Sequence, residues 1–501
     1  MRSHIQAHYT KHPVAQFNGN PLTEALPAPM RSSDILRRAG RAMQCDTDYW
    51  SLDSLYQRAI LQSMGDTHIP SDKFITFYQK CWSLLLHSYA YRNPLEPDAM
   101  ALKMGLAAQY RVQSQAQSQA KVDQPIKRSL ASHKTTASSV LVTGYSGAGK
   151  TTMIRSALSL IPQVIYHHEF EGKPYHQNQI VWVSLDMPST PSLKALALNF
   201  FRAVDDATGN TDYFEQWDSR NRESVDRHLA GMQLVAATHE IGLVHIDELQ
   251  FLLAYGKSDK APTLTILEAM FNKIGIPMII SCTDSGLQLF SKHVHVGGKS
   301  QPEITTLRRL VNDREFRLAT YSRDGDMFLK TLQALYPEWS LLNCTQLSTE
   351  FMTTFYEYTC GLPAFMTQLA QVHQEYLVYL SHEGELAPDA STNTLSYLNT
   401  VFSSQFQLYK MALKHLKGKN IRDYEDAIAA AQQAQHTQTA SPMSKTQAKA
   451  PRKASANTST LTPVSSASPS PSPRAPMLTP VLGESIATGP SVGSFNTGIK
   501  D

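Results

Sequence analysis

The stretch TGYSGAGKTT, residues 143–152, decides the fold of this chain. It meets the pattern Gly-x-x-x-x-Gly-Lys-[Ser/Thr] through Gly144, Gly149, Lys150 and Thr151, after the apolar run SSVLVT and before the amphipathic segment TMIRSALSLI. A strand before this pattern and a helix after it are the context in which the pattern forms a phosphate-binding loop, or P-loop. We therefore expect a nucleotide site at the start of a helix in an α/β fold.

The residues of this loop contribute through both backbone and side chains. Glycines at 144, 147 and 149 allow backbone conformations that a Cβ would forbid, so that N–H groups can point at phosphate oxygens near a helix N-terminus. We expect Lys150 to reach the β- and γ-phosphates of ATP and the Thr151 hydroxyl to ligate Mg²⁺. The expected ATP-binding residues are Gly144, Tyr145, Ser146, Gly147, Ala148, Gly149, Lys150, Thr151 and Thr152.

Two further apolar runs end in polar residues that suit nucleotide hydrolysis. The run IGLVHIDE ends in Asp247, which we expect to hold Mg²⁺ through water, and Glu248, which we expect to polarise the attacking water as the catalytic base. A strand ending in a solvated acidic pair is the alternative. The run IPMIISCTD places hydroxyl groups at a strand end, where ligands bind in α/β sheets. Thr283 is the candidate γ-phosphate sensor and Ser281 the alternative, while helix capping by Thr283 or Asp284 is an equally good interpretation.

A cluster of arginines follows these runs. The segment EITTLRRLVNDREFRLATYS carries Arg308 and Arg309 within an apolar frame. An arginine supplied to the γ-phosphate of a neighbouring subunit would stabilise the charge on the transferred phosphoryl group. Arg308 and Arg309 are the candidates for this role, and an ordinary surface ion pair is the alternative for each.

The remaining sequence predicts parts that flank the nucleotide core. Short runs rich in Val and Ile alternate with helical stretches, as in βαβ units with a buried parallel sheet. The runs expected to be strands are SSVLVTG, QIVWVSLD, IGLVHIDE and IPMIISCTD. The N-terminal part has apolar residues at helical spacing, among them Phe74, Phe77, Tyr78, Cys81 and Leu85. Past Asp426 the chain is rich in Ala, Ser, Thr and Pro, which predicts disorder. The expected parts are a helical N-terminal domain (1–125), a P-loop core (126–325), a helical lid with C-terminal helices (326–425) and a disordered tail (426–501).

Composition limits the class of protein. The 46 Lys and Arg against 43 Asp and Glu give a net charge of +3, so the charge of the whole chain does not indicate a nucleic-acid partner. The 5 cysteines are scattered without a Cys-x-x-Cys pair, which fits neither a disulfide framework nor a zinc site. No apolar run approaches the length of about 18–20 residues that spans a membrane, and the start lacks the apolar middle of a secretory signal. We expect a cytoplasmic protein without a membrane partner.

Together these features resemble the AAA+ ATPases and, within them, the transposition regulators of the TnsC/TniB family. Specific support comes from GNPLTEALP, residues 19–27, which is similar to a stretch of TnsC-type proteins of Tns transposons. The resemblance covers roughly residues 14–417. It implies an α/β fold: an AAA+ P-loop core with a parallel sheet, a helical N-terminal domain, a helical lid and a disordered C-terminal tail.

The resemblance also implies a function. Such a protein is a Mg²⁺-dependent ATPase that binds double-stranded DNA irrespective of sequence and assembles with itself into a ring or helical filament. It marks a target site for the transposase TnsA/TnsB and hydrolyses ATP to disassemble. A target selector of the TniQ/TnsD type, in some elements attached to a CRISPR effector, directs it to that site. One position departs from the family, because AAA+ lids often carry an arginine after Gly-x-Pro, whereas here Gly361 and Pro363 are followed by Ala364. The departure implies slow turnover.

Two segments are candidates for contacts with partners. In related ATPases the segment after the second strand faces DNA, which implies phosphate contacts by Lys194, Arg220, Arg222 and Arg227. A solvated helix face is the alternative for these residues. The last residues, GPSVGSFNTGIKD at 489–501, resemble a short docking peptide, which by analogy with TnsC would contact the transposase, and an inert tail is the alternative.

Other classes of protein remain open. A helicase loader or replication initiator of the AAA+ class shares the core, although no helix-turn-helix module is recognisable. A STAND-type signalling NTPase predicts a repeat of about 20–50 residues, and residues 329–501 contain none. A purely structural protein with a vestigial site conflicts with the intact Lys150, Thr151, Asp247 and Glu248.

Overall fold

The computed structural model describes residues 3–45, 47–115, 138–190, 192–220, 222–254, 275–289, 293–296, 299–302, 315–384, 390–418 and 420–439. The chain divides into two units, Met1–Ser441 and Pro442–Asp501, and all of the described residues belong to the first. The domain boundaries predicted at residues 125 and 325 remain predictions. The proposed docking peptide at 489–501 lies outside the described residues.

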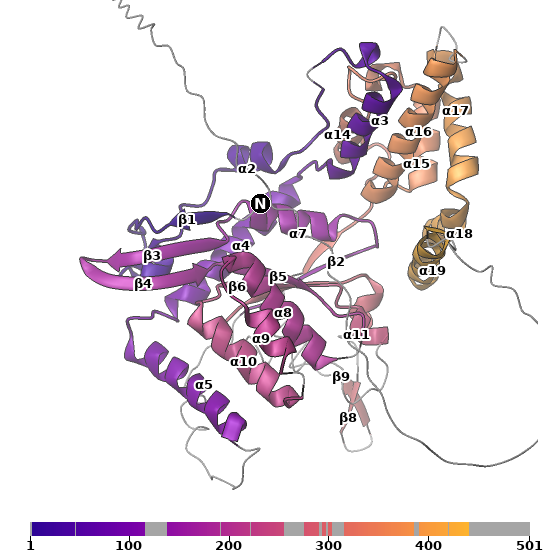
Figure 1. The fold of residues 1–501 in the computed structure, drawn as a ribbon. Helices are drawn as coiled ribbons and strands as arrows, with labels where there is room; N and C mark the ends of the chain where they lie inside the picture. The colour runs from indigo at the N-terminus through magenta and orange to yellow at the C-terminus, as the bar shows by residue number, and fades with distance from the viewer. Residues whose placement is uncertain are drawn as a thin grey trace, which may run out of the picture. The chain divides into compact units, whose positions relative to one another are not determined.

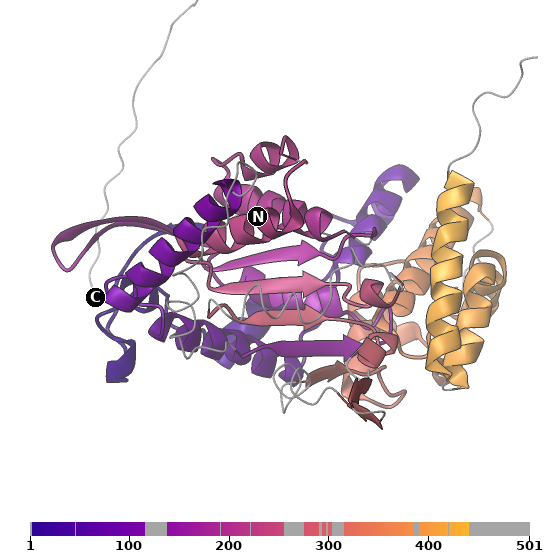
Figure 2. The same cartoon turned by 90° about the horizontal axis from the view of Figure 1, so that it is seen from below.

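The centre of the first unit is a parallel β-sheet (Figures 1 and 2). Within the described residues it has five strands in the order β10-β2-β7-β6-β5. The apolar runs predicted to be strands form β2, β6 and β7, and β7 separates the P-loop strand β2 from the acidic strand β6. The bounds of the strands are β2 (Val140–Gly144), β5 (Trp182–Asp186), β6 (Leu243–Asp247), β7 (Met278–Ser281) and β10 (Glu315–Leu318).

Helices cover both faces of this sheet. Val140 and Val142 on β2 pack in a hydrophobic cluster with one group of helices, while Leu141 packs with another, as expected for side chains that alternate along a strand. The first group includes α4 (Asp72–Ala90) and α7 (Lys150–Ser159). The second group includes α5 (Pro97–Gln115), α8 (Leu193–Thr208), α9 (Tyr213–Asp218) and α10 (Val225–Thr238). The apolar face predicted for α4 is confirmed, since the five residues named from its spacing are all buried.

The N-terminal part contains a strand as well as helices. Strand β1 (His4–Gln6) pairs in parallel with β3 (Val164–Phe170), which forms an antiparallel hairpin with β4 (Lys173–Ile180). The run QIVWVSLD was expected to be one strand, but it is divided between β4 and β5 because β4 pairs with β3, whereas β5 pairs with β6. The short helices of this part are η1 (Ala15–Phe17), α1 (Pro21–Glu24), α2 (Ser32–Ala39), η2 (Tyr49–Ser51), α3 (Ser54–Gln62) and η3 (Ser63–Asp66).

The stretch GNPLTEALP fastens this N-terminal part to the core. The Asn20 side chain caps α1 by accepting from Leu22 N at 2.9 Å and donates to Tyr89 O at 2.7 Å. The Leu22 side chain is buried, and its backbone oxygen accepts from Gln179 Nε2 at 3.0 Å. The Glu24 carboxylate accepts from Gly19 N at 2.6 Å. The polar residues Asn20 and Glu24 of this stretch therefore have structural partners within the fold.

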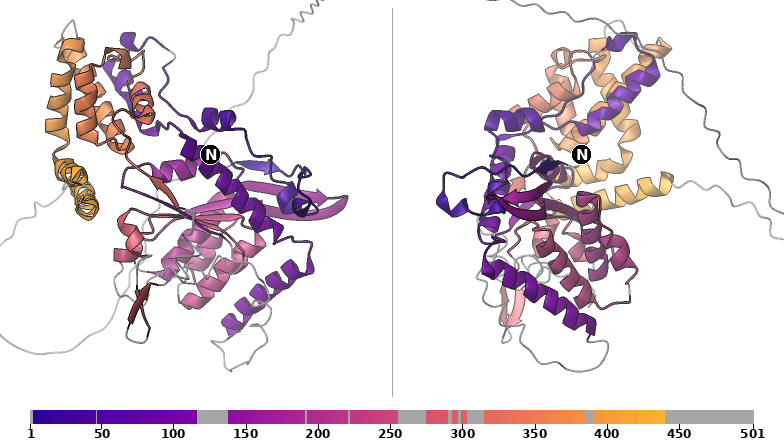
Figure 3. Two further views of the ribbon diagram at one scale, coloured as in Figure 1. Left: turned by 180° about the vertical axis from the view of Figure 1, so that it is seen from behind. Right: turned by 60° about the vertical axis from the view of Figure 1, so that its left-hand side comes forward.

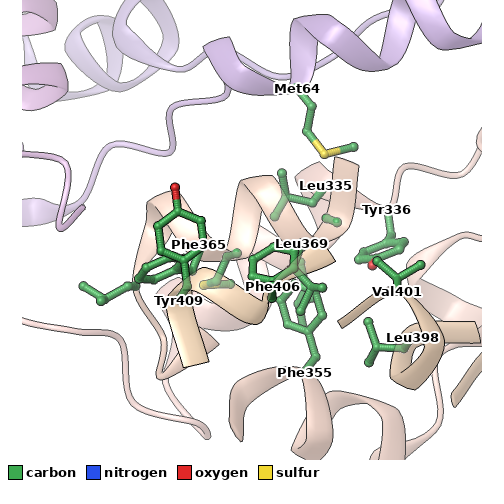
Figure 4. Close-up of a cluster of buried hydrophobic side chains, with 14 of the residues drawn as sticks. Met64, Leu335, Tyr336, Phe355, Phe365, Leu369, Leu398, Val401, Phe406 and Tyr409 are labelled. Atoms are coloured by element: carbon green, nitrogen blue, oxygen red, sulfur yellow. The ribbon is translucent and has the colours of Figure 1, made fainter. Parts of the chain in front are cut away.

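The C-terminal helices form a second hydrophobic core with the N-terminal part (Figure 4). Met64 of η3 points toward Leu335, and the cluster also contains Tyr49 and Leu61. Helix α3 consequently lies beside α16, although the two are far apart in sequence (Figure 3). The lid helices are α14 (Asp326–Leu335), η6 (Cys344–Gln346), α15 (Thr349–Thr359), α16 (Pro363–Glu383), α17 (Ala390–Gln405), η7 (Gln407–Tyr409), α18 (Lys410–Lys417) and α19 (Ile421–Thr439).

Helix α19 corrects one boundary. Disorder was expected from residue 426, but the helix continues to Thr439. The segment AIAAAQQAQ is rich in good helix formers, and Tyr424, Ile428 and Ala431 are buried in the lid core at helical spacing. Propensity and a buried face together extend the helix. The rest of the predicted tail, residues 440–501, lies outside the described residues.

Four smaller elements of the described chain lie between β6 and β10 in the sequence. The elements are α11 (Phe251–Ala254), η5 (Ser285–Leu289) and the antiparallel pair β8 (His293–Val296) and β9 (Lys299–Pro302). All 5 cysteines are free thiols. In the described ranges, no helix combines the length and the hydrophobicity needed to cross a membrane.

Candidate nucleotide site

The P-loop connects β2 to α7 in a conformation that requires glycine. Gly149, directly before α7, is left-handed with φ 87°. Gly144 has φ 147°, and a Cβ there would lie 2.4 Å from Leu318 O. Side chains are excluded at both positions, by backbone conformation and by contact respectively. The loop therefore has the open backbone that a phosphate-binding cradle needs.

Lys150 lies against this loop. Its Nζ donates to Gly144 O at 2.9 Å and to Tyr145 O at 3.0 Å, and its side chain is largely buried. Burial lowers the pKa of Lys150, although the nearby Glu248 opposes this shift. The ammonium group is thus held at the loop by carbonyl oxygens, which phosphate oxygens can replace as acceptors.

Asp247 accepts hydrogen bonds from three residues. The Thr151 hydroxyl of α7 donates to its Oδ2 at 2.7 Å, the Ser281 hydroxyl of β7 donates to its Oδ1, and Glu248 N donates to Oδ1 at 3.0 Å. Burial opposes the charge of Asp247, but the neighbouring His245 and these three donors outweigh it and lower its pKa. Sequence reasoning placed Thr151 and Asp247 at one metal site, and the structure brings them into direct contact.

The donor set of this pair fits Mg²⁺. A hydroxyl and a carboxylate oxygen are hard ligands, and Mg²⁺ in nucleotide sites is commonly held by one or two carboxylates together with phosphates and waters. Among the described residues, no group of three or more His, Cys, Asp or Glu could form an all-protein metal cage. Thr151 and Asp247 would therefore hold the ion on one side only, leaving its other positions to a ligand.

Glu248 is held by a residue that sequence reasoning missed. It has φ 59°, a left-handed conformation that is unusual for a side chain other than glycine, asparagine or aspartate. Gln250 Nε2 donates to the Glu248 carboxylate, and Gln250 Oε1 accepts from Thr283 N at 3.2 Å. Burial raises the pKa of Glu248, and the Asp247 carboxylate adds to the shift. The only local signal for Gln250 is its place in the sequence DELQ.

The two candidate sensors occupy different positions. The Ser281 hydroxyl is used by Asp247, whereas Thr283 lines the cavity described below and its hydroxyl lies 3.0 Å from Ser285 Oγ. Asp284, the alternative helix cap, instead accepts from Arg317 Nη2 at 2.8 Å. Of the hydroxyl groups that end β7, Thr283 is therefore the one that faces the open site.

A cavity of about 1010 Å³ extends from the P-loop. The residues that line it come from the P-loop, from the catalytic candidates Glu248 and Thr283, from the lid helices α14 and α16, and from residues 65–74 of the N-terminal part. At this last wall Thr67 Oγ1 and His68 Nδ1 are buried and have no hydrogen-bond partner in the described part of the chain. Burial lowers the pKa of His68 to about 4, so its imidazole is neutral near pH 7. Sequence reasoning did not include these residues in the site, because no local pattern marks them.

The lid meets the P-loop at two points. Ala364 N, at the start of α16, donates to Gly147 O at 3.2 Å, so the lid position that is often an arginine in AAA+ proteins makes a backbone contact here. Tyr424 of α19 donates from its hydroxyl to Ser146 O at 2.8 Å, and its ring stands edge-on to that of Tyr145. Both contacts connect the lid directly to the P-loop.

Residues 133–290, which contain the P-loop, Asp247, Glu248 and Thr283, match the family model described as the AAA domain. The chain carries an AAA-type P-loop ATPase domain. Among solved structures, the Walker-type ATPase of Pyrococcus abyssi is similar with 15% identity, a TM-score of 0.32, and coverage of 59% of this chain and 83% of that one. The Aeropyrum pernix ORC1 protein in complex with DNA has 12% identity, a TM-score of 0.32, and coverage of 68% and 79% respectively. No curated protein matches the sequence.

Two of the four candidate DNA contacts meet at Tyr110 of α5. Arg227 of α10 pairs with Glu223, which lies just before that helix, and lies over the Tyr110 ring, 5.5 Å from its centroid. Arg220 donates to the Tyr110 hydroxyl at 3.0 Å. Arg222 is exposed, and Lys194 lies in the first turn of α8.

Arg308 and Arg309, the candidates for an arginine supplied to the γ-phosphate of a neighbouring subunit, lie outside the described residues.

Proposed function

We propose that this protein is an ATP-dependent, DNA-binding regulator of transposition that assembles on double-stranded target DNA and links a target selector to a transposase. The observation that carries the nucleotide part is the network in which Thr151, Asp247, Glu248 and Thr283 are connected at one end of a large cavity. The resemblance of residues 19–27 to TnsC-type proteins favours transposition over other uses of an AAA ATPase.

The side chains of the site have separate roles in this proposal. Lys150 would exchange its carbonyl acceptors for the β- and γ-phosphates of ATP, and Thr283 would contact the γ-phosphate. Mg²⁺, when held by Thr151 and Asp247, would neutralise charge on the phosphates. Glu248, positioned by its hydrogen bond from Gln250, would orient and deprotonate the attacking water. Arg308 and Arg309 stay as candidates for the arginine supplied to a neighbour.

The cavity suggests that ATP serves assembly first and hydrolysis second. Its walls come from the N-terminal part, the sheet and the lid, so one bound nucleotide would fix three parts of the chain. Thr67 and His68 line the cavity and carry polar atoms without a hydrogen-bond partner among the described residues, which makes them candidates to contact the base of ATP. ATP would hold assembled subunits on DNA, and slow hydrolysis would release them, which sets how long a target stays marked.

The partner contacts are the remaining part of the proposal. Lys194, Arg220, Arg222 and Arg227 are candidates for phosphate contacts with DNA, and sequence-independent binding suits a regulator that accepts many target sites. The segment 489–501 would bind the TnsA/TnsB transposase, and a selector of the TniQ/TnsD type would bind elsewhere. Deleting the chain from Gly489 onward should spare DNA binding and abolish recruitment of the transposase in a pull-down. Normal recruitment by the truncated chain would contradict this role of the segment.

Electron microscopy tests the assembly directly. The purified full chain is mixed with duplex DNA and Mg²⁺ and imaged by negative stain, once with a non-hydrolysable ATP analogue and once without nucleotide. Nucleotide-dependent rings or filaments on DNA are the expected result. Particles that remain monomeric and do not bind DNA under either condition would contradict the proposal and favour a signalling ATPase.

A further inference from the structure

The first turn of α19 brings two side chains to the nucleotide site from the C-terminal end of the described chain. Tyr424 is fully buried and reaches Ser146 O, as described above. Its neighbour Glu425 reaches the start of η5, which follows β7, where its carboxylate accepts from Ser285 N at 3.2 Å and 3.4 Å through its two oxygens. One turn of one helix therefore contacts both the P-loop and the segment that carries the candidate sensor.

Glu425 lies beside the hydroxyl group that the γ-phosphate is expected to contact. Its carboxylate accepts from Ser285 N, and the Ser285 hydroxyl lies 3.0 Å from the Thr283 hydroxyl. Burial raises the pKa of Glu425, whereas the nearby hydroxyl groups of Ser285 and Thr283 and the Lys150 ammonium favour its charged form. A carboxylate and a terminal phosphate are both anions that accept hydrogen bonds. Two such groups repel one another when they share a partly buried site, so both cannot occupy these donors at low cost.

We propose that Glu425 is the residue through which the site distinguishes a nucleoside triphosphate from a diphosphate. In this inference, which rests on the proposed ATP site, Glu425 occupies Thr283 and Ser285 until a γ-phosphate displaces it. A diphosphate leaves the contact in place because it brings no group to Thr283. The displacement would free the first turn of α19 from the core, while Ile428 and Ala431 keep the rest of the helix in the lid.

The arrangement gives the lid a response to ATP that does not need a lid arginine. In the AAA+ proteins that the sequence resembles, an arginine after Gly-x-Pro often contacts the γ-phosphate, and Ala364 stands there in this chain. Glu425 would act in the opposite sense, because it leaves when the γ-phosphate arrives. The chain continues from α19 into residues 440–501, and the last part of these, 489–501, is the segment proposed to bind the transposase.

The charge of Glu425 can be removed with little change in shape. Glu425→Gln keeps a carboxamide oxygen for Ser285 N, and Asp426→Asn removes an exposed carboxylate from the next position of the same helix as a matched control. The affinities of the wild-type full chain and both variants for Mg²⁺-ADP and for a Mg²⁺-bound non-hydrolysable ATP analogue are measured by calorimetry without DNA. Glu425→Gln should raise the affinity for the analogue about tenfold, as expected for two charges a few ångströms apart, and leave the affinity for ADP unchanged. Asp426→Asn should change neither.

Amide hydrogen exchange of residues 421–431 provides a second measurement, which compares the two nucleotides in the wild type and in the variant. In the wild type, exchange in this turn should be faster with the analogue than with ADP, and in Glu425→Gln the two rates should agree. An unchanged ratio of analogue to ADP affinity in Glu425→Gln, or equal exchange with both nucleotides in the wild type, would overturn this inference alone. Failure of the wild type to bind either nucleotide would overturn the proposed function together with it.

Discussion

Charged side chains behave differently at the carboxyl end of the sheet and on the helices that flank it. At the sheet end, Lys150 of α7 and the adjacent Asp247 and Glu248 lie together, and Lys150 and Glu248 line one cavity. On the flank, Arg220 and Arg227 both contact Tyr110. Charges that line one cavity are costly to bury and indicate a shared ligand, whereas cations that pack on an aromatic ring already gain stability from that contact.

The largest effect should come from removing the ammonium group at the P-loop. Lys150→Ala should weaken binding of the ATP analogue by a factor of about 100 or more, because two charge-assisted hydrogen bonds to phosphate are lost. Nucleotide-dependent assembly on DNA should disappear with it. Calorimetry measures the affinity, and Lys194→Ala, a cation on the flank, is the control that should bind the analogue normally. Equal weakening by both substitutions would remove the distinction between the two regions.

The next effect concerns hydrolysis without loss of binding. Glu248→Gln should lower kcat by a factor of about 10²–10⁴, as expected when a general base is lost. Affinity for the analogue should stay within a few-fold of the wild type, and assemblies on DNA should persist longer in the presence of ATP. Phosphate release and time-resolved electron microscopy check these outcomes. Full hydrolysis by the variant would assign the base to another residue.

A smaller effect is expected from the residue that aims this base. Gln250→Ala should reduce kcat about tenfold with little change in KM, because the hydrogen bond to a charged group at Glu248 is lost while the phosphate contacts remain. Steady-state kinetics separate the two parameters. A rise in KM at constant kcat would mean that Gln250 contributes to binding and does not position Glu248.

The smallest effects distinguish the arginines of the flank from one another. Arg222→Ala removes an exposed cation and should reduce the slope of log affinity for DNA against log salt by about 1. Arg227→Ala should leave that slope unchanged and lower the free energy of unfolding by about 1 kcal/mol, because the contacts with Glu223 and Tyr110 are lost. Salt-dependent DNA titration and thermal unfolding measure the two. A reduced slope in the Arg227 variant would show that its paired guanidinium is still available to DNA.

Local patterns were sufficient for the parts of the site that lie within one strand-to-loop unit. The P-loop, the acidic pair after β6 and the hydroxyl groups after β7 follow short apolar runs, and parallel strands bring their carboxyl ends to one edge of the sheet. The residue types alone left the order of Ser281 and Thr283 open. The structure separates them, because Ser281 is used by Asp247 and Thr283 is not.

Some predictions depended on neighbours that the sequence pattern does not reveal. The disordered tail was expected from residue 426, where the composition changes, but helix propensity and the burial of Tyr424, Ile428 and Ala431 extend α19 to Thr439. The stretch GNPLTEALP was recognised by resemblance, while its internal partners, among them Tyr89 and Gln179, lie far along the chain. Residue type alone could not identify these pairs.

By itself, the sequence determined that this chain has a P-loop, an acidic pair and an α/β core. Each of these depends on backbone conformations and strand ends that a few consecutive residues specify. The tertiary structure decided which groups complete the site. Residues 65–74 supply one wall of the cavity, Gln250 joins Glu248 to Thr283, and Glu425 arrives from a helix at the other end of the described chain. These contacts depend on how the N-terminal part and the lid pack on the sheet, and buried surfaces distributed over the whole unit determine that packing.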